Sequence, residues 1–363
     1  MSSEVQSGLE GVVAFATEIA EPDRDGGALR YRGVDIEDLV GAVPYEKVWG
    51  LLVDGEVEPG LPPAEPRPLP LRSGNARVDV QAALATLGAG EGGFRALIDI
   101  SDEQARADLA RASSLALSFV AQSARGADRP AVAQSDIDRG ATLAERFLIR
   151  WRGAADPDHV RAVDAYWVSA AEHGMNASTF TARVVASTGA DSAAALSSAV
   201  GALSGPLHGG APSRVLRMLD EVEQLGDAER WVRDALDRGE RLMGFGHRVY
   251  RAEDPRARVL RRTARELGSP RFEVAEALER AALAELHARK PDRVLATNVE
   301  FWSAVVLDLA DVPANLFTAM FTGARVAGWS AHILEQKREG RLIRPTAAYV
   351  GPAARALASL ARA

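Results

Sequence analysis

Residues 244–258 read GFGHRVYRAEDPRAR and combine a flexible turn, a titratable imidazole and four arginines. The two glycines at the start allow a sharp turn and a close approach of the backbone to a ligand. Asp254 and Pro255 predict a helix N-cap and the first helical residue, so Arg256 falls in the first turn, where free N–H groups and the helix dipole favour an anion. With His247 nearby, the stretch is suited to hold a small carboxylate and polarise it. A solvated, arginine-rich helix start containing a buried histidine fits the same residues equally well.

The composition around this stretch limits the possible classes of protein. The chain has 363 residues, of which 47% are hydrophobic, enough for a large core, and this length predicts two domains. Its 43 basic and 50 acidic side chains give a net charge of −7, which argues against a general nucleic-acid binder. The absence of cysteine excludes disulfides and thiolate chemistry. With no signal-peptide pattern at the start and no apolar run near the ~18 residues of a membrane span, we expect a soluble cytoplasmic protein without nucleic-acid or membrane partners.

The fold class follows from the spacing of apolar residues. A turn at 25–27 predicts a small β-hairpin between 12–20 and 28–32, and a helix is expected from 35 to about 53. Six of the 18 prolines fall in 59–70, which indicates an extended surface connection. From about residue 78 onward the period is 3.6 residues, typical of helices, in stretches that include 105–122, 137–151, 160–172, 178–187, 192–203, 213–225, 228–237, 255–267, 274–288, 299–309 and 315–337. The sequence therefore predicts an all-α protein with a short N-terminal hairpin.

Two further histidines lie in glycine-containing turns. His208, within SGPLHGG (204–210), sits on a turn just ahead of a predicted helix that begins near Pro212, where its tautomer can be fixed by a backbone group. His173, within EHGMNAS (172–178), lies at a helix end where Gly174 resembles a C-cap glycine. A glycine cap that happens to contain a histidine, or a histidine stabilised by the negative end of a helix, explains either one alone.

Glu300 is an acidic residue in the otherwise apolar stretch TNVEFW (297–302). Burial beside Phe301 and Trp302 would raise the pKa of its carboxyl, which suits a general base. An acidic residue in a first helical turn is also a common capping device, which remains the simpler explanation for Glu300 alone.

Several other kinds of site are excluded. There is no cysteine and no HExxH pair to provide metal-ligand spacing. A GxSxG serine elbow and a GxxxxGK[ST] nucleotide loop are also missing.

Taken together, the motifs resemble those of citrate synthases. EHGMNAS, SGPLHGG, GFGHRVYRAEDPR, TNVEFW and RLIRPTAAYVGP (341–352) occur in the order and spacing of that family. Residues 11–39, GVVAFATEIAEPDRDGGALRYRGVDIEDL, are similar to its opening hairpin and first helix. The resemblance covers nearly the whole chain and is strongest to the short bacterial type, as found in actinobacteria.

The resemblance implies an all-α, citrate synthase-like homodimer in which a smaller mobile domain closes over the substrates. Carried onto this chain, the large domain would comprise 1–209 and 311–363, and the small domain 210–310. The implied reaction condenses acetyl-CoA with oxaloacetate and hydrolyses the citryl thioester to citrate and CoA. The enzyme would be an acyltransferase that uses no cofactor and no metal.

The resemblance also implies roles for individual residues. His208 would hydrogen-bond the thioester oxygen, His247 would polarise the oxaloacetate carbonyl, and Glu300 would take the methyl proton. The residues facing oxaloacetate would be His173, Asn176, His247, Arg256, Arg325 and Arg344, the last reaching across the dimer. Those lining the coenzyme A site would be Leu207, Leu242, Gly244 and Phe245, with Arg251 and Arg293 as candidates for its phosphates.

One residue departs from the family pattern. The family usually has aspartate where this chain has Glu300, and a misplacement of ~1 Å can cost ~100-fold in rate. Three alternatives therefore stay open beside citrate synthase: 2-methylcitrate synthase using propionyl-CoA, citryl-CoA cleavage in the reverse direction, and a catalytically weak regulatory homologue.

Overall fold

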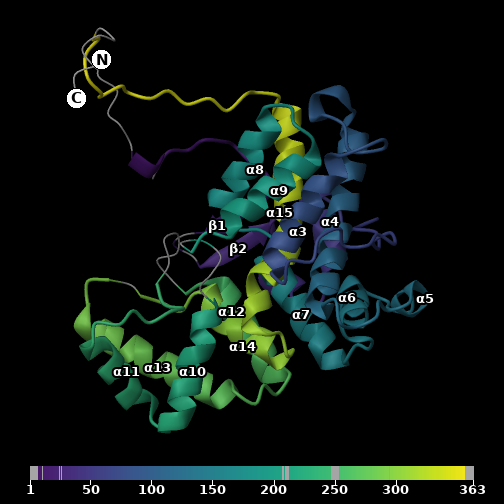
Figure 1. The fold of residues 1–363 in the computed structure, drawn as a ribbon. Coiled ribbons are helices and arrows are strands. Elements are labelled where there is room, and N and C mark those ends of the chain that lie inside the picture. The colour runs from purple at the N-terminus through teal and green to yellow at the C-terminus, as the bar shows by residue number, and fades with distance from the viewer. Residues whose placement is uncertain are drawn as a thin grey trace, which may run out of the picture.

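The computed structural model describes residues 7–9, 11–23, 25, 27–206, 208, 212–246, 253–293 and 295–355. Within them the chain is predominantly helical, with one small sheet near the N-terminus (Figure 1). The prediction of an all-α fold with a short N-terminal β-element is confirmed. None of the described helices is both long and apolar enough to cross a membrane.

The sheet has three short antiparallel strands, β1 (Ala20–Asp23), β2 (Ala28–Tyr31) and β3 (Val34–Asp35). Ala20 pairs with Tyr31, and Tyr31 pairs with Val34. The predicted hairpin is therefore present, but its first strand is shorter than expected, because residues 12–17 have no regular structure.

Tyr31 connects this sheet to the body of the protein. Its side chain is fully buried, and its hydroxyl lies 3.1–3.2 Å from the carbonyl oxygens of Val168, Ser169 and Glu172. A single hydroxyl thus covers carbonyls at the end of a helix, where the last turn has no intrahelical donors of its own.

The helices follow in chain order. The α-helices are α1 (Ile36–Leu39), α2 (Tyr45–Asp54), α3 (Ala76–Ala85), α4 (Asp102–Arg125), α5 (Gln134–Ile137), α6 (Leu143–Arg152), α7 (Pro157–Ala170), α8 (Ala177–Ser187), α9 (Ser192–Leu203), α10 (Pro212–Leu225), α11 (Ala228–Asp237), α12 (Pro255–Glu266), α13 (Phe272–Arg289), α14 (Val299–Leu309) and α15 (Phe317–Glu339). Short 3-10 helices are η1 (Ser7–Leu9), η2 (Thr86–Gly88), η3 (Leu97–Asp99) and η4 (Ala314–Leu316).

Two helices predicted as continuous are interrupted. The expected helix over 35–53 is α1 and α2, separated at Gly41, whose φ of 82° leaves the helical region. The expected helix over 137–151 is α5 and α6, and the Thr142 side chain accepts the Glu145 N–H at 3.2 Å to start α6 anew. Apolar residues at helical spacing lie on both sides of each break, so periodicity alone did not reveal the breaks, which Gly41, Pro44 and Gly140 mark in the sequence.

Helix α15 runs through the middle of the larger group of helices, with α3, α4, α8 and α9 around it (Figure 1). Small residues along α15 allow close approach. The Gly328 N–H donates to the Ala171 carbonyl at 3.1 Å, and a Cβ on Gly328 would lie 2.0 Å from Oε2 of Glu172. Only glycine fits there, so α15 is pressed directly against the segment that follows α7.

Helices α10–α14 form a second group (Figure 1). Within it, the Trp302 indole N–H donates to Glu279 Oε1 at 2.9 Å, which joins α14 to α13, and Arg271 pairs with Asp220 and Glu223 on α10. Helices α12 and α14 also pack on α7, so this group meets the larger one at α7.

Beyond α15, residues 341–355 contain no helix or strand. They run outward from the end of α15 as an extended segment, shown in yellow in Figure 1. Tyr349 and Val350 are 80% and 94% exposed, so this segment presents apolar side chains to solvent.

The close contact at Gly328 gives a test of the packing. Gly328→Ala should lower the free energy of unfolding by about 2–3 kcal/mol, because the added methyl overlaps backbone and a buried carboxylate that cannot move aside. Urea unfolding followed by circular dichroism measures this. The matched control is Gly201→Ala in α9, where the methyl meets only the flexible amide end of Gln81. Equal unfolding midpoints for the two variants would contradict the close contact.

Candidate active site

The segment between α7 and α8 carries two of the predicted site residues, His173 and Asn176. Ala171 ends α7, and Gly174 follows with φ 61°, so the glycine lies beyond the helix cap and turns the chain toward α8. His173 is 9% exposed. The two helix ends thus hold the segment in place from both sides.

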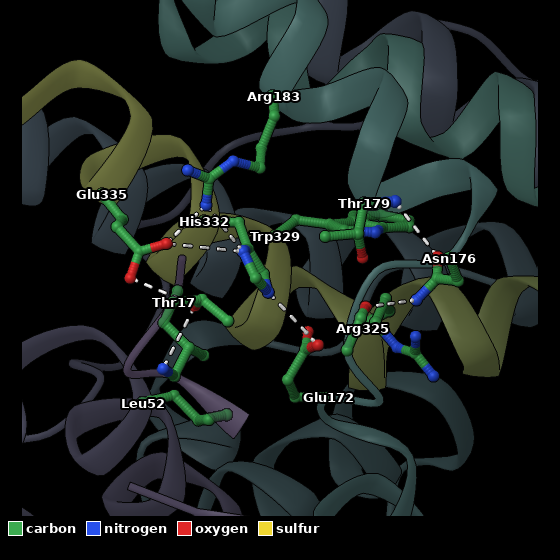
Figure 2. A network of polar contacts seen from close by, with 12 residues as sticks. Thr17, Leu52, Glu172, Asn176, Thr179, Arg183, Arg325, Trp329, His332 and Glu335 are labelled. Atoms are coloured by element: carbon green, nitrogen blue, oxygen red, sulfur yellow. Dashed lines mark hydrogen bonds and ion pairs between the residues drawn. The ribbon is translucent and has the colours of Figure 1, made fainter. Parts of the chain in front are cut away.

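Asn176 acts as the N-cap of α8. Its Oδ1 accepts the Thr179 N–H at 3.1 Å and the Ser178 hydroxyl at 2.8 Å, and its Nδ2 donates to the Gly174 carbonyl at 3.2 Å (Figure 2). Asparagine is favoured at this position because its side-chain oxygen satisfies an otherwise unpaired N–H. The carboxamide therefore fixes the shape of this segment.

His208 is held by the start of α8. The Ser178 N–H donates to His208 Nε2 at 3.3 Å, and the Ser178 hydroxyl lies 2.9 Å from the same nitrogen. The Trp329 indole N–H donates to that hydroxyl at 3.2 Å, which ties the arrangement to α15. Because a backbone N–H can only donate, Nε2 is an acceptor, and the ring carries its proton on Nδ1.

The surroundings also favour the neutral form of His208. Burial lowers the pKa of the imidazole from 6.5 to about 4, and the positive charge of Arg325 acts in the same direction. A neutral ring with a proton on Nδ1 is a hydrogen-bond donor without net charge, suited to a carbonyl oxygen that gains electron density.

Arg256 lies in the first turn of α12, as predicted, and Asp254 is the N-cap. Both side chains are buried, and Nε and Nη2 of Arg256 donate to the two oxygens of Asp254 at 3.0 and 2.7 Å. Asp254 also accepts the Arg256 N–H at 3.0 Å and the Val299 N–H at 3.1 Å. One carboxylate therefore joins the starts of α12 and α14.

Glu300 occupies the first turn of α14, where Asn298 caps the helix by accepting the Glu300 N–H at 3.0 Å. The side chain is half-buried. Burial raises the pKa of its carboxyl, while Arg256 and Arg241 oppose the change and Asp254 adds to it. A raised pKa makes the carboxylate a stronger base, as the sequence predicted for this position.

The glycine-rich start of the 244–258 motif, residues 244–246, is bound to the same helix start. Asn298 N–H donates to the Gly244 carbonyl at 2.9 Å, and Asn298 Nδ2 donates to the Gly246 carbonyl at 2.9 Å. The Phe245 ring packs on Phe301 at a centroid distance of 5.4 Å. A Cβ on Gly244 would lie 2.8 Å from Phe301 Cβ, so this approach requires glycine. Leu242, just before, is buried.

Arg325 projects from α15 and is 2% exposed. Its Nε donates to the Ala170 carbonyl at 2.9 Å, and its guanidinium lies 4.8 Å from the centre of the Phe321 ring. Burial lowers the pKa of Arg325, Glu172 raises it, and Arg256 lowers it further, so these three charges act on one another.

These contacts bring most of the predicted residues into two adjoining clusters. His173, Asn176, His208 and Arg325 gather between α7, α8 and α15, while Arg256, Glu300, Gly244 and Phe245 gather at the starts of α12 and α14. The mutual effect of Arg256 and Arg325 links the two clusters.

Other predicted residues are not brought together. Arg344 is exposed in the extended segment after α15, where the Ile343 N–H donates to Ser187 Oγ at 3.1 Å. Arg293 is exposed after α13. Leu207, His247 and Arg251 lie outside the described residues. In the described part of the chain, no three His, Cys, Asp or Glu side chains lie close enough to hold a metal ion.

Sequence reasoning missed two residues that hold His208, namely Ser178 and Trp329. Ser178 follows the Asn176 cap by two residues, which is the one local signal that its N–H faces outward at a helix start. Trp329 is fully buried and 151 residues away from Ser178 in the chain, so only the fold places its N–H there.

The helical fold and the two clusters match a known class of enzyme. The family "Citrate synthase, C-terminal domain" matches residues 8–346. The chain therefore belongs to the citrate synthase family, whose members are acyltransferases.

Two curated proteins of this family are similar to the chain over nearly its whole length. The chain is 69% identical to "Putative citrate synthase 2" of Mycobacterium tuberculosis over 349 residues, which cover 96% of this chain and 93% of that protein. It is 37% identical to the citrate synthase of Haloferax volcanii over 376 residues, which cover 97% of each.

Solved structures agree with this assignment. The citrate synthase of Pyrobaculum aerophilum matches with a TM-score of 0.83 at 31% identity, over 97% of this chain and 94% of that one. The citrate synthase of Thermoplasma acidophilum, described as a ternary complex with carboxymethyl coenzyme A and oxaloacetate, also matches. Its TM-score is 0.81 at 29% identity, over 98% of this chain and 99% of that one.

The environment of His208 predicts a pH dependence. Between pH 6.5 and about 4 the unfolded chain binds a proton at this ring that the folded protein does not, so the free energy of unfolding falls as the pH is lowered through this range. Urea unfolding at a series of pH values measures the slope. In His208→Gln the slope over the same range should be shallower than in the wild type. Identical slopes would show that His208 does not titrate in this way.

Proposed function

We propose that this chain is a citrate synthase that condenses acetyl-CoA with oxaloacetate and hydrolyses the resulting citryl thioester to citrate and CoA. The observation that carries the proposal is the neutral His208, bound at Nε2 by the Ser178 N–H and left with a proton on Nδ1. Removing a proton from the methyl group of a thioester requires a donor that stabilises the developing oxyanion, and His208 has the form needed for that role.

Glu300 is the proposed base. It lies at the start of α14, and its raised pKa suits proton abstraction from carbon. The methyl proton moves to the Glu300 carboxylate while the thioester oxygen receives a hydrogen bond from His208. The enolate carbon then attacks the oxaloacetate carbonyl carbon, while His247 polarises the carbonyl and donates the proton that its oxygen takes up. Water then cleaves the citryl thioester to release CoA. The reaction as proposed requires no cofactor and no metal.

The two carboxylates of oxaloacetate would be bound by arginines. Arg325 and Arg256 come from the two clusters, and Arg344 would come from the partner subunit, with His173 and Asn176 completing the surroundings. Arginine suits this task because its planar fork donates two parallel hydrogen bonds to one carboxylate. The ternary complex described for the Thermoplasma acidophilum neighbour supports the pairing of oxaloacetate with a coenzyme A derivative.

The coenzyme A site would lie along Leu207, Leu242, Gly244 and Phe245, with Arg251 and Arg293 near its phosphates. In this proposal residues 210–310 form a small domain that closes onto the large domain, 1–209 and 311–363. Closure would bring Arg256 and Arg325 onto one dicarboxylate and exclude water during carbon–carbon bond formation.

Release of CoA tests the reaction directly. With oxaloacetate, acetyl-CoA should give a kcat/KM at least about tenfold above that of propionyl-CoA, the scale expected for one methylene group. His208→Ala should lower kcat by ~10²–10⁴. The matched control is His287→Ala, an exposed histidine on α13, which should leave kcat unchanged.

The other outcomes of this assay identify the alternatives. Preference for propionyl-CoA would assign 2-methylcitrate synthesis. Acetyl-CoA formed only from citrate and added CoA would assign the reverse cleavage. No turnover in any direction by a folded protein would assign a non-catalytic homologue.

Substitutions of Glu300 test the base. Glu300→Gln keeps the size of the side chain but cannot accept a proton, so kcat should fall by ~10²–10⁴ while oxaloacetate binding changes little. The kcat of Glu300→Asp should fall by ~100-fold, because the fully buried Phe301 and Trp302 hold the backbone in place and the shorter side chain leaves the carboxylate out of reach. Exchange of the acetyl-CoA methyl protons, followed by NMR, measures the step itself. Wild-type exchange in Glu300→Gln would assign the base to another group.

Mixed dimers test the role of Arg344. If it completes the partner's site, Arg344→Ala mixed with His208→Ala forms hybrid dimers with one intact site. Random exchange should then restore about a quarter of wild-type activity, since half of the dimers are hybrids with one of two sites intact. Subunit exchange is checked with two labels by energy transfer. Exchange without recovered activity would place Arg344 in its own subunit's site or outside any site.

A further inference from the structure

Behind the candidate site, α8 and α15 enclose a row of polar side chains that the proposed reaction does not use (Figure 2). Arg183 of α8 is fully buried and pairs with Glu335 and Glu339, which lie at the surface end of this row of polar side chains. Its Nη1 also lies 3.1 Å from Nδ1 of His332, whose Nε2 lies 3.3 Å from Oε1 of Glu172. This row of polar side chains therefore ends at Glu172, the residue next to His173.

The direction of these hydrogen bonds follows from Arg183. A guanidinium can only donate, so His332 Nδ1 is an acceptor and the ring proton is on Nε2. That proton is donated to Glu172, which is thereby held on one side of its carboxylate. Burial raises the pKa of the Glu172 carboxyl, but His332, Arg325 and the His173 N–H together lower it below its ordinary value, so the group is ionised.

The position of Glu172 is fixed on its other side as well. Its Oε2 is buried and has no hydrogen-bond partner among the described residues, and it lies where a Cβ on Gly328 would be 2.0 Å away. The backbone of α15 thus closes the space behind this oxygen. His332 and Gly328 together leave the carboxylate little freedom to change position.

Arg325 is the charge that this arrangement faces. Among the described residues, its side chain forms one hydrogen bond, from Nε to the Ala170 carbonyl two residues before Glu172. Figure 2 draws Glu172 beside His332 and the Arg325 side chain to one side of it, with no bond between the two. Arg256, Tyr31 and Tyr166 also lie near enough to affect Arg325, but Glu172 has the largest favourable effect on its charge.

Burying a guanidinium without a counter-charge is unfavourable. Removing one partner from a buried ion pair therefore destabilises a protein strongly. A carboxylate in direct contact would solve that problem but would occupy the donors that a substrate needs. A carboxylate held nearby by other groups balances the charge and leaves those donors available.

We propose that Glu172 is the resident counter-charge of Arg325, held by His332 and Gly328 close enough to balance the guanidinium in the empty site but out of its hydrogen-bonding reach. Glu172 is in this sense a positioning residue, since it touches no reacting atom. It stabilises the empty site and, because it repels a bound dicarboxylate, weakens the binding of oxaloacetate and of the tricarboxylate product. This inference rests on the proposed function, in which Arg325 binds a substrate carboxylate.

Glu172→Gln separates this role from a structural one. Glutamine keeps the size of the side chain and an acceptor for His332 Nε2–H, but it removes the charge. The melting temperature without ligand should fall, because Arg325 loses its counter-charge. Oxaloacetate should bind about tenfold more tightly, since removing a nearby charge commonly shifts such equilibria by one unit or more on a logarithmic scale. A residue that only maintained the fold would give weaker or unchanged binding when lost.

The measurement is the dissociation constant of oxaloacetate, by calorimetry without acetyl-CoA, together with the melting temperature with and without oxaloacetate. Glu335→Gln is the matched control, because it removes a carboxylate from the far end of the same row of polar side chains but keeps the hydrogen bond between His332 and Glu172. It should lower the melting temperature while changing oxaloacetate affinity less than twofold. Equal tightening in both variants would overturn the proposal.

A second variant protects the test if Glu172→Gln does not fold. In His332→Leu the carboxylate loses its hydrogen-bond donor and becomes free to pair with Arg325, so oxaloacetate should bind more weakly. Unchanged affinity there, or unchanged or weaker affinity in Glu172→Gln, overturns the role of Glu172 while leaving the proposed function intact. A wild-type protein that does not bind oxaloacetate at all overturns the proposed function first, and this inference with it.

Discussion

The buried carboxylate of Asp254 is the contact on which the geometry of the second cluster depends. It accepts hydrogen bonds from the N–H, Nε and Nη2 of Arg256 and from the N–H of Val299, so it binds the starts of two helices, which lie more than 40 residues apart in the chain. A charge-assisted bond of this kind is stronger than one between neutral groups and more demanding in direction. The orientation of Arg256 and the position of the α14 start, which carries Glu300, are therefore set by one side chain.

The same construction from helix ends recurs in the first cluster. Asn176 begins α8, Ser178 in its first turn holds His208, and the end of α7 presents the Ala170 carbonyl to Arg325. Helix ends leave backbone donors and acceptors without partners inside the helix, so they are natural places to bind polar side chains. Candidate site residues gather here because several helices end close to one another.

Local sequence rules predicted the helix starts well. Asp254 with Pro255 was predicted as a cap and residue 299 as the start of a helix, and the structure places helices at both. The breaks at Gly41 and before Thr142 were not predicted, although Gly41, Pro44 and Gly140 lie at them, because apolar residues at helical spacing are present on both sides of each break. The spacing of apolar residues within a segment thus predicts that a helix is present. Where the helix is interrupted depends on the local backbone conformation.

Partners distant in the chain were beyond prediction from the residues alone. The 244–258 stretch indicated a place for an anion at the start of α12, but the carboxylate that fills the Arg256 fork in this structure is Asp254 of the same turn. Glu172 and His332 are separated by 160 residues, and Ser178 and Trp329 by 151, so nothing local marks either pair. The order and spacing of whole motifs carried the family assignment, while the groups behind the candidate site became visible only in the fold.

The Tyr31 hydroxyl extends the influence of the small sheet well beyond its size. It covers the carbonyls of Val168, Ser169 and Glu172, the last of which begins the segment leading to His173. A chain shortened to begin after β2 would keep every candidate site residue and yet leave that helix end uncovered. The N-terminal strands therefore hold the end of α7 in place although they contribute no candidate site residue. Loss of these strands would be expected to disorder the segment that carries His173.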